Sequence, residues 1–233
     1  MDLDLNDILW EDEDILVIRK HAGTPVQHVG IGKMDLEHLL LNYLAIGNTE
    51  KRRTPYLAVI HRLDQPVEGI LMFAKNRDSA KKLNDQMVKN QIKKDYLAVA
   101  ENAPKILEGT LRDYLLKKKS SNKSEVVTKN TPGAKRAILS YQMLTGDDQS
   151  GRALLSISLK TGRHHQIRVQ MSHADMPLCG DRKYNEDYID GEQLALCAYK
   201  LKFFHPVTNQ ELKFQINPEN VIFRPFLEEL KRQ

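Results

Sequence analysis

Short apolar segments separated by polar turns dominate the N-terminal part of the chain. Ile8–Trp10 and Ile15–Ile18 flank the acidic run Glu11–Asp14, a pattern typical of two strands joined by a tight turn. The apolar segments Tyr56–Ile60 and Ile70–Ala74 have strand length and are separated by residues that include proline and glycine. We therefore expect all four segments to be β-strands.

Two segments of the same region have the periodicity of helices. Residues 34–46 follow this pattern, and Asp35 can cap a helix there while Gly47 can end it. Its apolar positions recur at helical spacing and are Leu36, Leu39, Leu40, Tyr43 and Leu44. A second helix is expected over residues 77–90, with one face formed by Ala80, Leu83, Met87 and Val88.

The C-terminal part begins with strand patterns. Asp95–Ala100 and Ala153–Leu159 are predicted to be strands, whereas the polar residues 117–135 indicate a long basic loop or excursion. Two last strands, Leu196–Phe203 and Leu212–Ile216, are expected to be joined through a turn that contains proline and asparagine.

Two more helices complete the pattern. Thr161-Gly162 forms a turn before a helix that holds Ile167, Met171 and Ala174 on one side, and Pro225 can start a short closing helix. Strands and helices interleave without a regular βαβ rhythm. This order predicts an α+β fold with a mixed, mostly antiparallel sheet flanked by helices and loops. We expect a single domain over residues 1–233, because no linker separates parts of the chain.

Composition excludes several classes of protein. The 233 residues are 41% hydrophobic and 28% charged, as in ordinary globular proteins, which argues against disorder. The sequence contains no run of about 18 apolar residues, so no membrane span is predicted. The acidic N-terminus does not resemble a secretion signal. The two cysteines, Cys179 and Cys197, are expected to be small core residues in a cytoplasmic protein.

Charge is distributed unevenly along the chain. The net charge is +4, but residues 1–50 carry 3 Lys/Arg against 10 Asp/Glu, and residues 81–136 carry 14 Lys/Arg against 6 Asp/Glu. A basic middle segment suggests a polyanionic partner such as RNA. The alternative is a solvated, lysine-rich surface.

The connection His61–Gly69 holds the most informative chemistry. A carboxylate, Asp64, lies in this short segment between two predicted strands, which is where proteins often place reactive side chains. By itself it would be interpreted as a turn aspartate. A kinase catalytic loop is not indicated, because there the aspartate directly follows the arginine, whereas Leu63 separates them here.

Two further segments make this connection specific. Together the three resemble the RluA family of pseudouridine synthases, in order and spacing as well as composition, over about residues 8–218. The segments are His61-Arg62-Leu63-Asp64 with Gly69–Lys75, Lys94–Ala98, and Thr161–Val169 continuing to Pro177–Tyr184. The resemblance implies a pseudouridine synthase catalytic fold and an enzyme that isomerises uridine in RNA.

The resemblance also assigns roles to single residues. Asp64 corresponds to the catalytic aspartate of the family, Tyr96 to the tyrosine against the target base, and Arg168 to the arginine that pairs with the catalytic carboxylate. Arg62 corresponds to a residue that helps to fill the gap left by a flipped nucleotide. The family needs no cofactor and no metal.

These residue types suit the reaction. Breaking a glycosidic bond builds positive character on the sugar, which a carboxylate can stabilise or attack. A neighbouring guanidinium favours the ionised carboxylate, and an aromatic ring supports a base taken out of its stack. Whether Asp64 attacks C1′ or removes the 2′-proton stays open. Assistance by Tyr96 in removing the C5 proton is a hypothesis.

The partner is expected to be structured RNA, either ribosomal or transfer RNA. Neither DNA nor a membrane is expected as a partner. Candidate RNA contacts are the basic and histidine residues near these segments, namely His61, Arg62, Lys117, Lys118, Lys119, Arg163, His164 and His165. His164 and His165 are adjacent rather than one helical turn apart, so they are not expected to bind a metal together. We expect a monomer.

The sequence departs from the usual family pattern at a few positions. Val67-Glu68-Gly69 stands where Thr-Ser-Gly is common, and Gln170 and Asp175-Met176 also differ. These changes affect the choice of RNA rather than the reaction. Seven residues precede the first predicted strand, so no N-terminal S4 RNA-binding domain is expected. The competing interpretations are a non-catalytic RNA-binding protein on the same scaffold and a glycosidase that releases free uracil.

Overall fold

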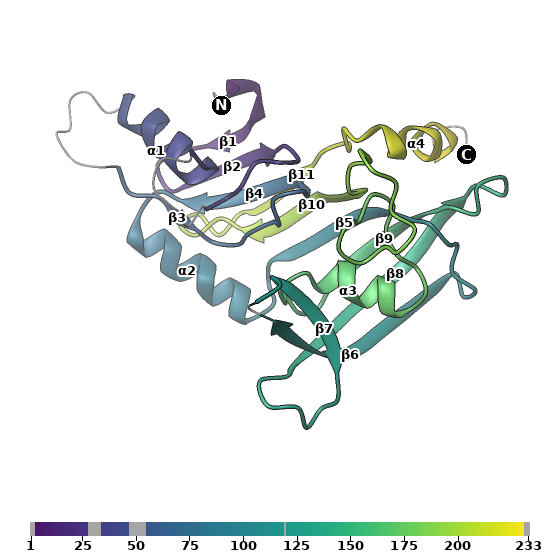
Figure 1. The fold of residues 1–233 in the computed structure, drawn as a ribbon. Coiled ribbons are helices and arrows are strands. Elements are labelled where there is room, and N and C mark those ends of the chain that lie inside the picture. The colour runs from purple at the N-terminus through teal and green to yellow at the C-terminus, as the bar shows by residue number, and fades with distance from the viewer. Residues whose placement is uncertain (1–2, 28–33, 47–54, 119, 231–233) are drawn as a thin grey trace. The chain divides into compact units, whose positions relative to one another are not determined.

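A computed structural model describes residues 3–27, 34–46, 55–118 and 120–230 (Figure 1). The chain forms two compact units, the first from residues 1–93 and 199–217 and the second from residues 94–198 and 218–233. The expectation of a single domain stays a prediction, because the compactness of each unit does not test whether it folds alone. Gly47 and Lys119 lie outside the described residues.

The first unit contains the strands expected around the Asp64 segment. β1 (Ile8–Glu11) pairs with β2 (Ile15–Lys20), and β4 (Glu68–Ala74) pairs with both β2 and β3 (Ala58–Val59), all antiparallel. β4 is buried along its whole length, as a strand covered on both faces should be. The predicted strands are confirmed, although β3 has only two residues. A 3-10 helix, η1 (Leu5–Asp7), precedes β1.

Two α-helices accompany these strands. α1 (Leu36–Ile46) begins after Asp35, whose carboxylate accepts the backbone N–H of His38, and this confirms the predicted cap. α2 (Arg77–Val88) is capped by Asn76 and packs on β4. The prediction for Val88 was wrong. Its side chain is 82% exposed, because it is the last residue of the helix and lies beyond the buried stripe that includes Ala80 and Leu83.

The predicted C-terminal hairpin is also confirmed. β10 (Leu196–Phe204) pairs antiparallel with β11 (Glu211–Gln215), and its residues from 199 onward belong to the first unit. Asn209 has φ 57 in the connecting turn, a left-handed conformation that asparagine adopts more readily than most residues. Gln86 of α2 holds the hairpin, donating to the carbonyl of Phe204 and accepting its N–H.

The second unit is built on an antiparallel sheet. Its strand order is β5-β9-β8-β6-β7, and every pair is antiparallel. The strands are β5 (Lys93–Ala100), β6 (Glu108–Lys118), β7 (Lys123–Val127), β8 (Lys135–Gly146) and β9 (Ala153–Leu159). β5 and β9 confirm two predicted strands.

Three strands of this sheet escaped the sequence pattern. β7 and the ends of β6 and β8 lie within residues 117–135, where a long loop or excursion was expected. At least half of the positions in each strand are partly exposed and few are buried, so few positions carry the alternating apolar residues that identify a strand. Backbone pairing joins these strands, and a few side chains, among them Leu115 and Leu139, are buried. Tyr114 to Lys118 pair residue by residue with Val127 back to Lys123, and the basic segment is therefore the end of a hairpin.

Two α-helices belong to the second unit. α3 (Gln166–His173) packs against β6 and β7, and α4 (Arg224–Leu230) packs against β8 after a 3-10 helix, η2 (Val221–Phe223). Both helices were expected, the second from Pro225. The predicted α+β class with a mostly antiparallel arrangement is confirmed. Among the described residues, no helix has the length and apolar character needed to cross a bilayer.

Candidate active site

Asp64 lies in the connection from β3 to β4, at the start of a tight turn. The N–H of Val67 donates to the carbonyl of Asp64 at 3.0 Å and closes the turn, which has Pro66 at its centre. Gly69 then begins the pairing of β4 with β2 at φ 141, a conformation that favours glycine. Asp64 is partly exposed, whereas the neighbouring Leu63 and Val67 are buried. The apolar neighbours anchor the turn and leave the carboxylate near the surface.

A buried lysine supports this turn. The side chain of Lys20, at the end of β2, is 1% exposed, and its ammonium donates to the carbonyls of His21 at 3.0 Å, Gln65 at 3.0 Å and Val67 at 2.7 Å. Burial lowers the pKa of Lys20 to about 7, and the charges of Asp64 and Glu68 oppose this shift. The positive charge of Lys20 in turn favours the ionised form of both carboxylates.

Tyr96 lies on β5, opposite Ile157 of β9, and is 6% exposed. The pairing of β5 with β9 fixes the backbone at this position, and the low exposure shows that the side chain is largely covered by protein. Lys94 lies two residues earlier on the same face of the strand, and burial lowers the pKa of its ammonium. The role of Tyr96 against a target base stays a prediction.

Arg168, on α3, forms a buried ion pair with Asp181. Its Nε donates to Oδ2 at 2.8 Å and its Nη2 donates to Oδ1 at 2.6 Å, with side-chain exposures of 4% for Arg168 and 0% for Asp181. This bidentate pair orients the guanidinium. A guanidinium has five N–H donors, so the bonds to Asp181 are compatible with a further acceptor. The expected pairing of Arg168 with Asp64 stays a prediction, because the two residues belong to different units.

Tyr184 connects this ion pair to the β6–β7 hairpin. The guanidinium of Arg168 lies over the Tyr184 ring, 5.2 Å from its centre, and the Tyr184 hydroxyl accepts the N–H of Ser124 on β7 at 2.7 Å. The same hydroxyl lies 2.8 Å from Nδ1 of His165. Since it already accepts from Ser124, it can donate its hydrogen to His165, which then carries its own hydrogen on Nε2.

The two adjacent histidines support this arrangement. Their rings stack at 3.8 Å, and the side chain of Ser124 bonds to both Nδ1 and the backbone carbonyl of His164. His165 precedes α3 at φ 52 and is buried. Burial, followed by the positive charge of Arg168, lowers the pKa of His165 to about 2, so the ring is neutral at physiological pH. The pair therefore helps to fix the hairpin on α3.

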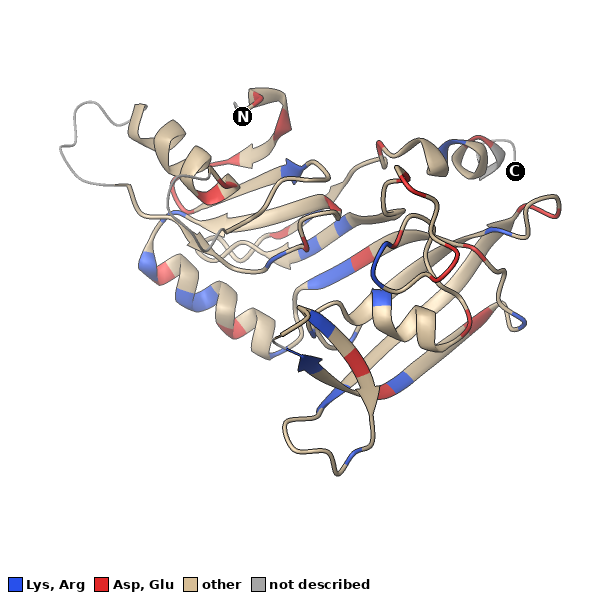
Figure 2. Cartoon of the chain, viewed as in Figure 1, with Lys and Arg blue, Asp and Glu red and all other residues tan. Residues whose placement is uncertain are grey.

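The predicted RNA contacts differ in how accessible they are. Arg62, Arg163, Lys117 and Lys118 are exposed, and His164 is partly exposed. His61 and His165 are buried at 8% and 7% exposure, so they offer a polyanion little surface. Figure 2 shows Lys and Arg at the ends of both strands of the β6–β7 hairpin. Lys118 forms an ion pair with Glu125 at 2.5 Å, which reduces its effective charge.

One group of side chains in the described part of the chain has the composition of a metal site. The ligand atoms of Asp12, Asp14 and His205 lie within 4.8 Å of one another. They already bond to protein groups, since Nε2 of His205 donates to Asp12 and its Nδ1 accepts two backbone N–H groups. Asp14 accepts from Asn76 and Ser79. These contacts explain the cluster as a structural tie between turns.

Sequence reasoning missed Lys20, Asp181 and Tyr184. A signal for Lys20 was present in the sequence, because it ends a strand whose first four residues are apolar and buried. Asp181 could have been found from the rule that a buried arginine needs an acidic partner. Asp181 follows Gly180, whose φ is 68. A Cβ added at Gly180 would lie 2.2 Å from the carbonyl oxygen of Gln193. The turn therefore requires glycine, and Asp181 is placed by it.

Comparison with known proteins identifies relatives along most of the chain. Residues 14–173 match the family model described as RNA pseudouridylate synthase. Ribosomal large subunit pseudouridine synthase C of Buchnera aphidicola subsp. Baizongia pistaciae is 32% identical over 97% of this chain and 70% of its own length. Ribosomal large subunit pseudouridine synthase D of Vibrio cholerae is 32% identical over 91% of this chain and 67% of its own.

A relative with a different named substrate matches as well, and so do solved structures. The tRNA pseudouridine synthase C of Haemophilus ducreyi is 30% identical over 88% of each chain. Among structures, the human protein RNA Pseudouridylate Synthase Domain Containing 4 superposes with a TM-score of 0.76 over 97% of this chain and 93% of its own, at 24% identity. At that identity the likeness concerns the fold.

Proposed function

This chain belongs to the RluA family of RNA pseudouridine synthases, and on that premise we propose that it isomerises uridine in structured ribosomal RNA, using Asp64 as its catalytic carboxylate. The enzyme class follows from family membership, whereas the substrate and the residue roles are proposals. The support for Asp64 is its place in a turn that buried neighbours and a buried ammonium hold in one conformation.

The reaction exchanges one bond to the ribose for another. The C1′–N1 bond breaks, the uracil rotates, and a C1′–C5 bond forms, while C5 loses its hydrogen and N1 gains one. Asp64 engages the sugar in the first step, either by attack on C1′ or by removal of the 2′-proton. Its partial exposure lets it reach a ribose, and the charge of Lys20 favours the carboxylate form that either route requires.

Two residues of the second unit complete the proposed chemistry. Tyr96 supports the flipped base and assists the loss of the C5 proton, a role suited to an aromatic ring on the paired strand β5. Arg168 holds the carboxylate of Asp64 in its ionised form. The bidentate bond to Asp181 and the stacking on Tyr184 set the direction of the guanidinium before substrate binds.

RNA binding is proposed to use exposed cations around these elements. Arg163 lies just before α3, and Lys117 lies at the end of β6, where the hairpin leaves the sheet. Such residues bind phosphates and orient a folded RNA, while the base is identified after it leaves the helix. Arg62 is exposed in the Asp64 segment, and its proposed role is to fill the space left by that base.

A tritium assay tests the proposal. Unmodified transcripts of ribosomal large-subunit RNA and of transfer RNAs are prepared with tritium at C5 of uridine, because the isomerisation releases that hydrogen into water. We expect release from a ribosomal transcript, with the modified position mapped afterwards. Tritium release from transfer RNA alone would transfer the proposal to that substrate, which the Haemophilus ducreyi relative favours.

The same experiment separates the competing functions. A glycosidase would release labelled free uracil, which chromatography detects, and would leave an abasic site in the RNA. A non-catalytic RNA-binding protein would retain the transcripts without changing them. Either outcome with every transcript tested would overturn the proposed function.

A further inference from the structure

The end of β2 holds a charged group in an unusual environment. Lys20 is among the largest fully buried side chains of the described residues, with 1% exposure. Lysine is almost never fully buried unless its ammonium is paired, because an unsolvated charge costs several kcal/mol. A group of this kind in the first unit, next to Asp64, calls for a role that the family chemistry does not supply.

The contacts of Lys20 converge on the turn that carries Asp64. Three backbone carbonyls accept from the ammonium, and two of them, those of Gln65 and Val67, belong to that turn. An ammonium has three N–H donors, so the three carbonyls match the charged form. Gln65 and Val67 lie 45 and 47 positions after Lys20, so these two bonds join β2 to the turn before β4.

A second tie joins the same two segments. The N–H of Gly23 donates to the carbonyl of Gln65 at 2.8 Å, and the side-chain amide of Gln65 donates to the carbonyl of Gly23 at 2.9 Å. Gly23 has φ 88, which lets the chain turn beneath Gln65. The turn is therefore held both by the ammonium of Lys20 and by the two hydrogen bonds between Gly23 and Gln65, while Asp64 stays partly exposed.

We propose that Lys20 is a positioning residue for Asp64, fixing the carboxylate-bearing turn through its carbonyls and facing both acidic side chains of the loop with a buried positive charge. The proposal rests on the proposed role of Asp64. Lys20 itself touches no substrate. A displacement of about 1 Å at a catalytic group can cost about 10²-fold in rate, and the three carbonyl bonds prevent such a displacement.

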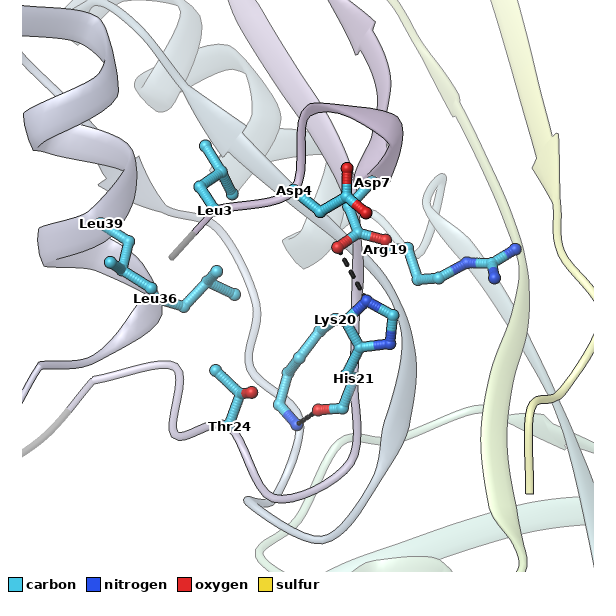
Figure 3. A pocket seen from close by; sticks show the side chains of 9 residues that line it. All are labelled: Leu3, Asp4, Asp7, Arg19, Lys20, His21, Thr24, Leu36 and Leu39. Carbon is cyan, nitrogen blue, oxygen red and sulfur yellow. Dashed lines mark hydrogen bonds and ion pairs between the residues drawn. The ribbon is translucent and has the colours of Figure 1, made fainter. Parts of the chain in front are cut away.

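The surroundings of Lys20 make its charge dependent on pH. Figure 3 shows its ammonium bonded to the carbonyl of His21 at the edge of a cavity of about 70 Å³. The charged or titratable groups that face it are Asp64 and Glu68 from the loop, with Asp4, Asp7, Arg19 and His21 around the cavity. Burial lowers the pKa of Lys20 to about 7. Deprotonation leaves two donors for three carbonyls, so the turn loosens as the pH rises.

The test replaces Lys20 and compares it with a second lysine. Lys20→Met removes the ammonium but keeps the apolar stem, and Lys20→Arg keeps a charge that does not titrate. Lys75→Met is the matched control, because Lys75 is a partly buried lysine of the first unit that bonds to Glu11 and to the carbonyl of Asp12 instead. Each variant is compared with wild type by single-turnover rate, RNA affinity and urea unfolding.

Three results are expected. Lys20→Met lowers the single-turnover rate about 10²-fold with RNA affinity within about threefold, and Lys75→Met keeps the wild-type rate. Hydrogen exchange at the N–H groups of Val67 and Gly23 becomes faster in Lys20→Met alone. The wild-type rate falls above about pH 7 to 8, whereas this alkaline decline is absent from Lys20→Arg, whatever its maximal rate.

Other results would overturn the proposal. A Lys20→Met enzyme with a wild-type rate, or an alkaline decline that persists in Lys20→Arg, contradicts it. If Lys20→Met does not fold, the pH profile of wild type against Lys20→Arg decides. If wild type modifies no RNA, the proposed function fails instead. The exchange of Val67 and Gly23 across pH then still reports whether Lys20 holds the turn.

Discussion

Neutralising one partner of the Arg168–Asp181 pair should destabilise the protein more than removing both. Arg168→Met leaves the Asp181 carboxylate, which is 0% exposed, without the two bonds of 2.8 and 2.6 Å that it accepts now. Stranding one charge of a buried pair costs about 3–5 kcal/mol of unfolding free energy. Asp181→Asn strands the guanidinium and should cost a similar amount.

The double variant Arg168→Met/Asp181→Asn tests this reasoning. In wild type, the N–H groups of Lys183 and Tyr184 donate to Oδ1 of Asp181. In the double variant, the side-chain amide at position 181 keeps an oxygen that can accept these bonds. No buried charge remains, so the double variant should be destabilised less than either single variant, and less than the two single losses added together by at least about 3 kcal/mol. Urea unfolding followed by circular dichroism, with the four proteins at one pH, measures this coupling.

Activity should not recover with stability. If Arg168 acts on Asp64, the double variant has no guanidinium and stays as inactive as Arg168→Met, although it is better folded. Losses of unfolding free energy that add within about 0.5 kcal/mol would refute the account of the pair. Recovery of the reaction in the double variant would refute the catalytic role of Arg168 and leave the structural one.

Three further outcomes are expected. Tyr96→Phe should bind RNA as wild type does but release C5 tritium at least about tenfold more slowly, and normal turnover would remove Tyr96 from proton transfer. Lys117→Ala should reduce the slope of log affinity against log salt by about one. Lys118→Ala, whose lysine is paired with Glu125, should reduce the slope less, and Lys213→Ala on β11 should not change it. His165 should stay neutral in NMR titrations between pH 5 and 8, because burial and the charge of Arg168 lower its pKa to about 2, and a midpoint near 6.5 would contradict its burial.

The sequence was sufficient where hydrophobic periodicity was strong. The strands before and after Asp64 and the helix capped by Asp35 follow from local pattern, because the buried faces of these elements repeat at the period of the backbone. β6, β7 and β8 could not be predicted in the same way. They are mostly partly exposed and paired by backbone groups, and those groups leave no mark on side-chain composition.

The candidate site shows the same division. Asp64, Tyr96 and Arg168 were identified from motifs, but the groups that hold them in place were not. Lys20 reaches Gln65 across 45 positions, and Asp181 meets Arg168 across a turn set by Gly180. Such contacts depend on tertiary packing, and a single sequence does not specify which carbonyl or carboxylate a buried cation will find.

The central claim is that the carboxylate of Asp64 performs the chemistry, and single-turnover tritium release by Asp64→Asn tests it most directly. Asp78→Asn, which replaces an exposed carboxylate on α2, is the control. We predict that Asp64→Asn binds the substrate RNA within about threefold of wild type and loses about 10⁴-fold or more in rate, while Asp78→Asn retains full activity. Release of tritium by Asp64→Asn at a rate near that of wild type would contradict the account.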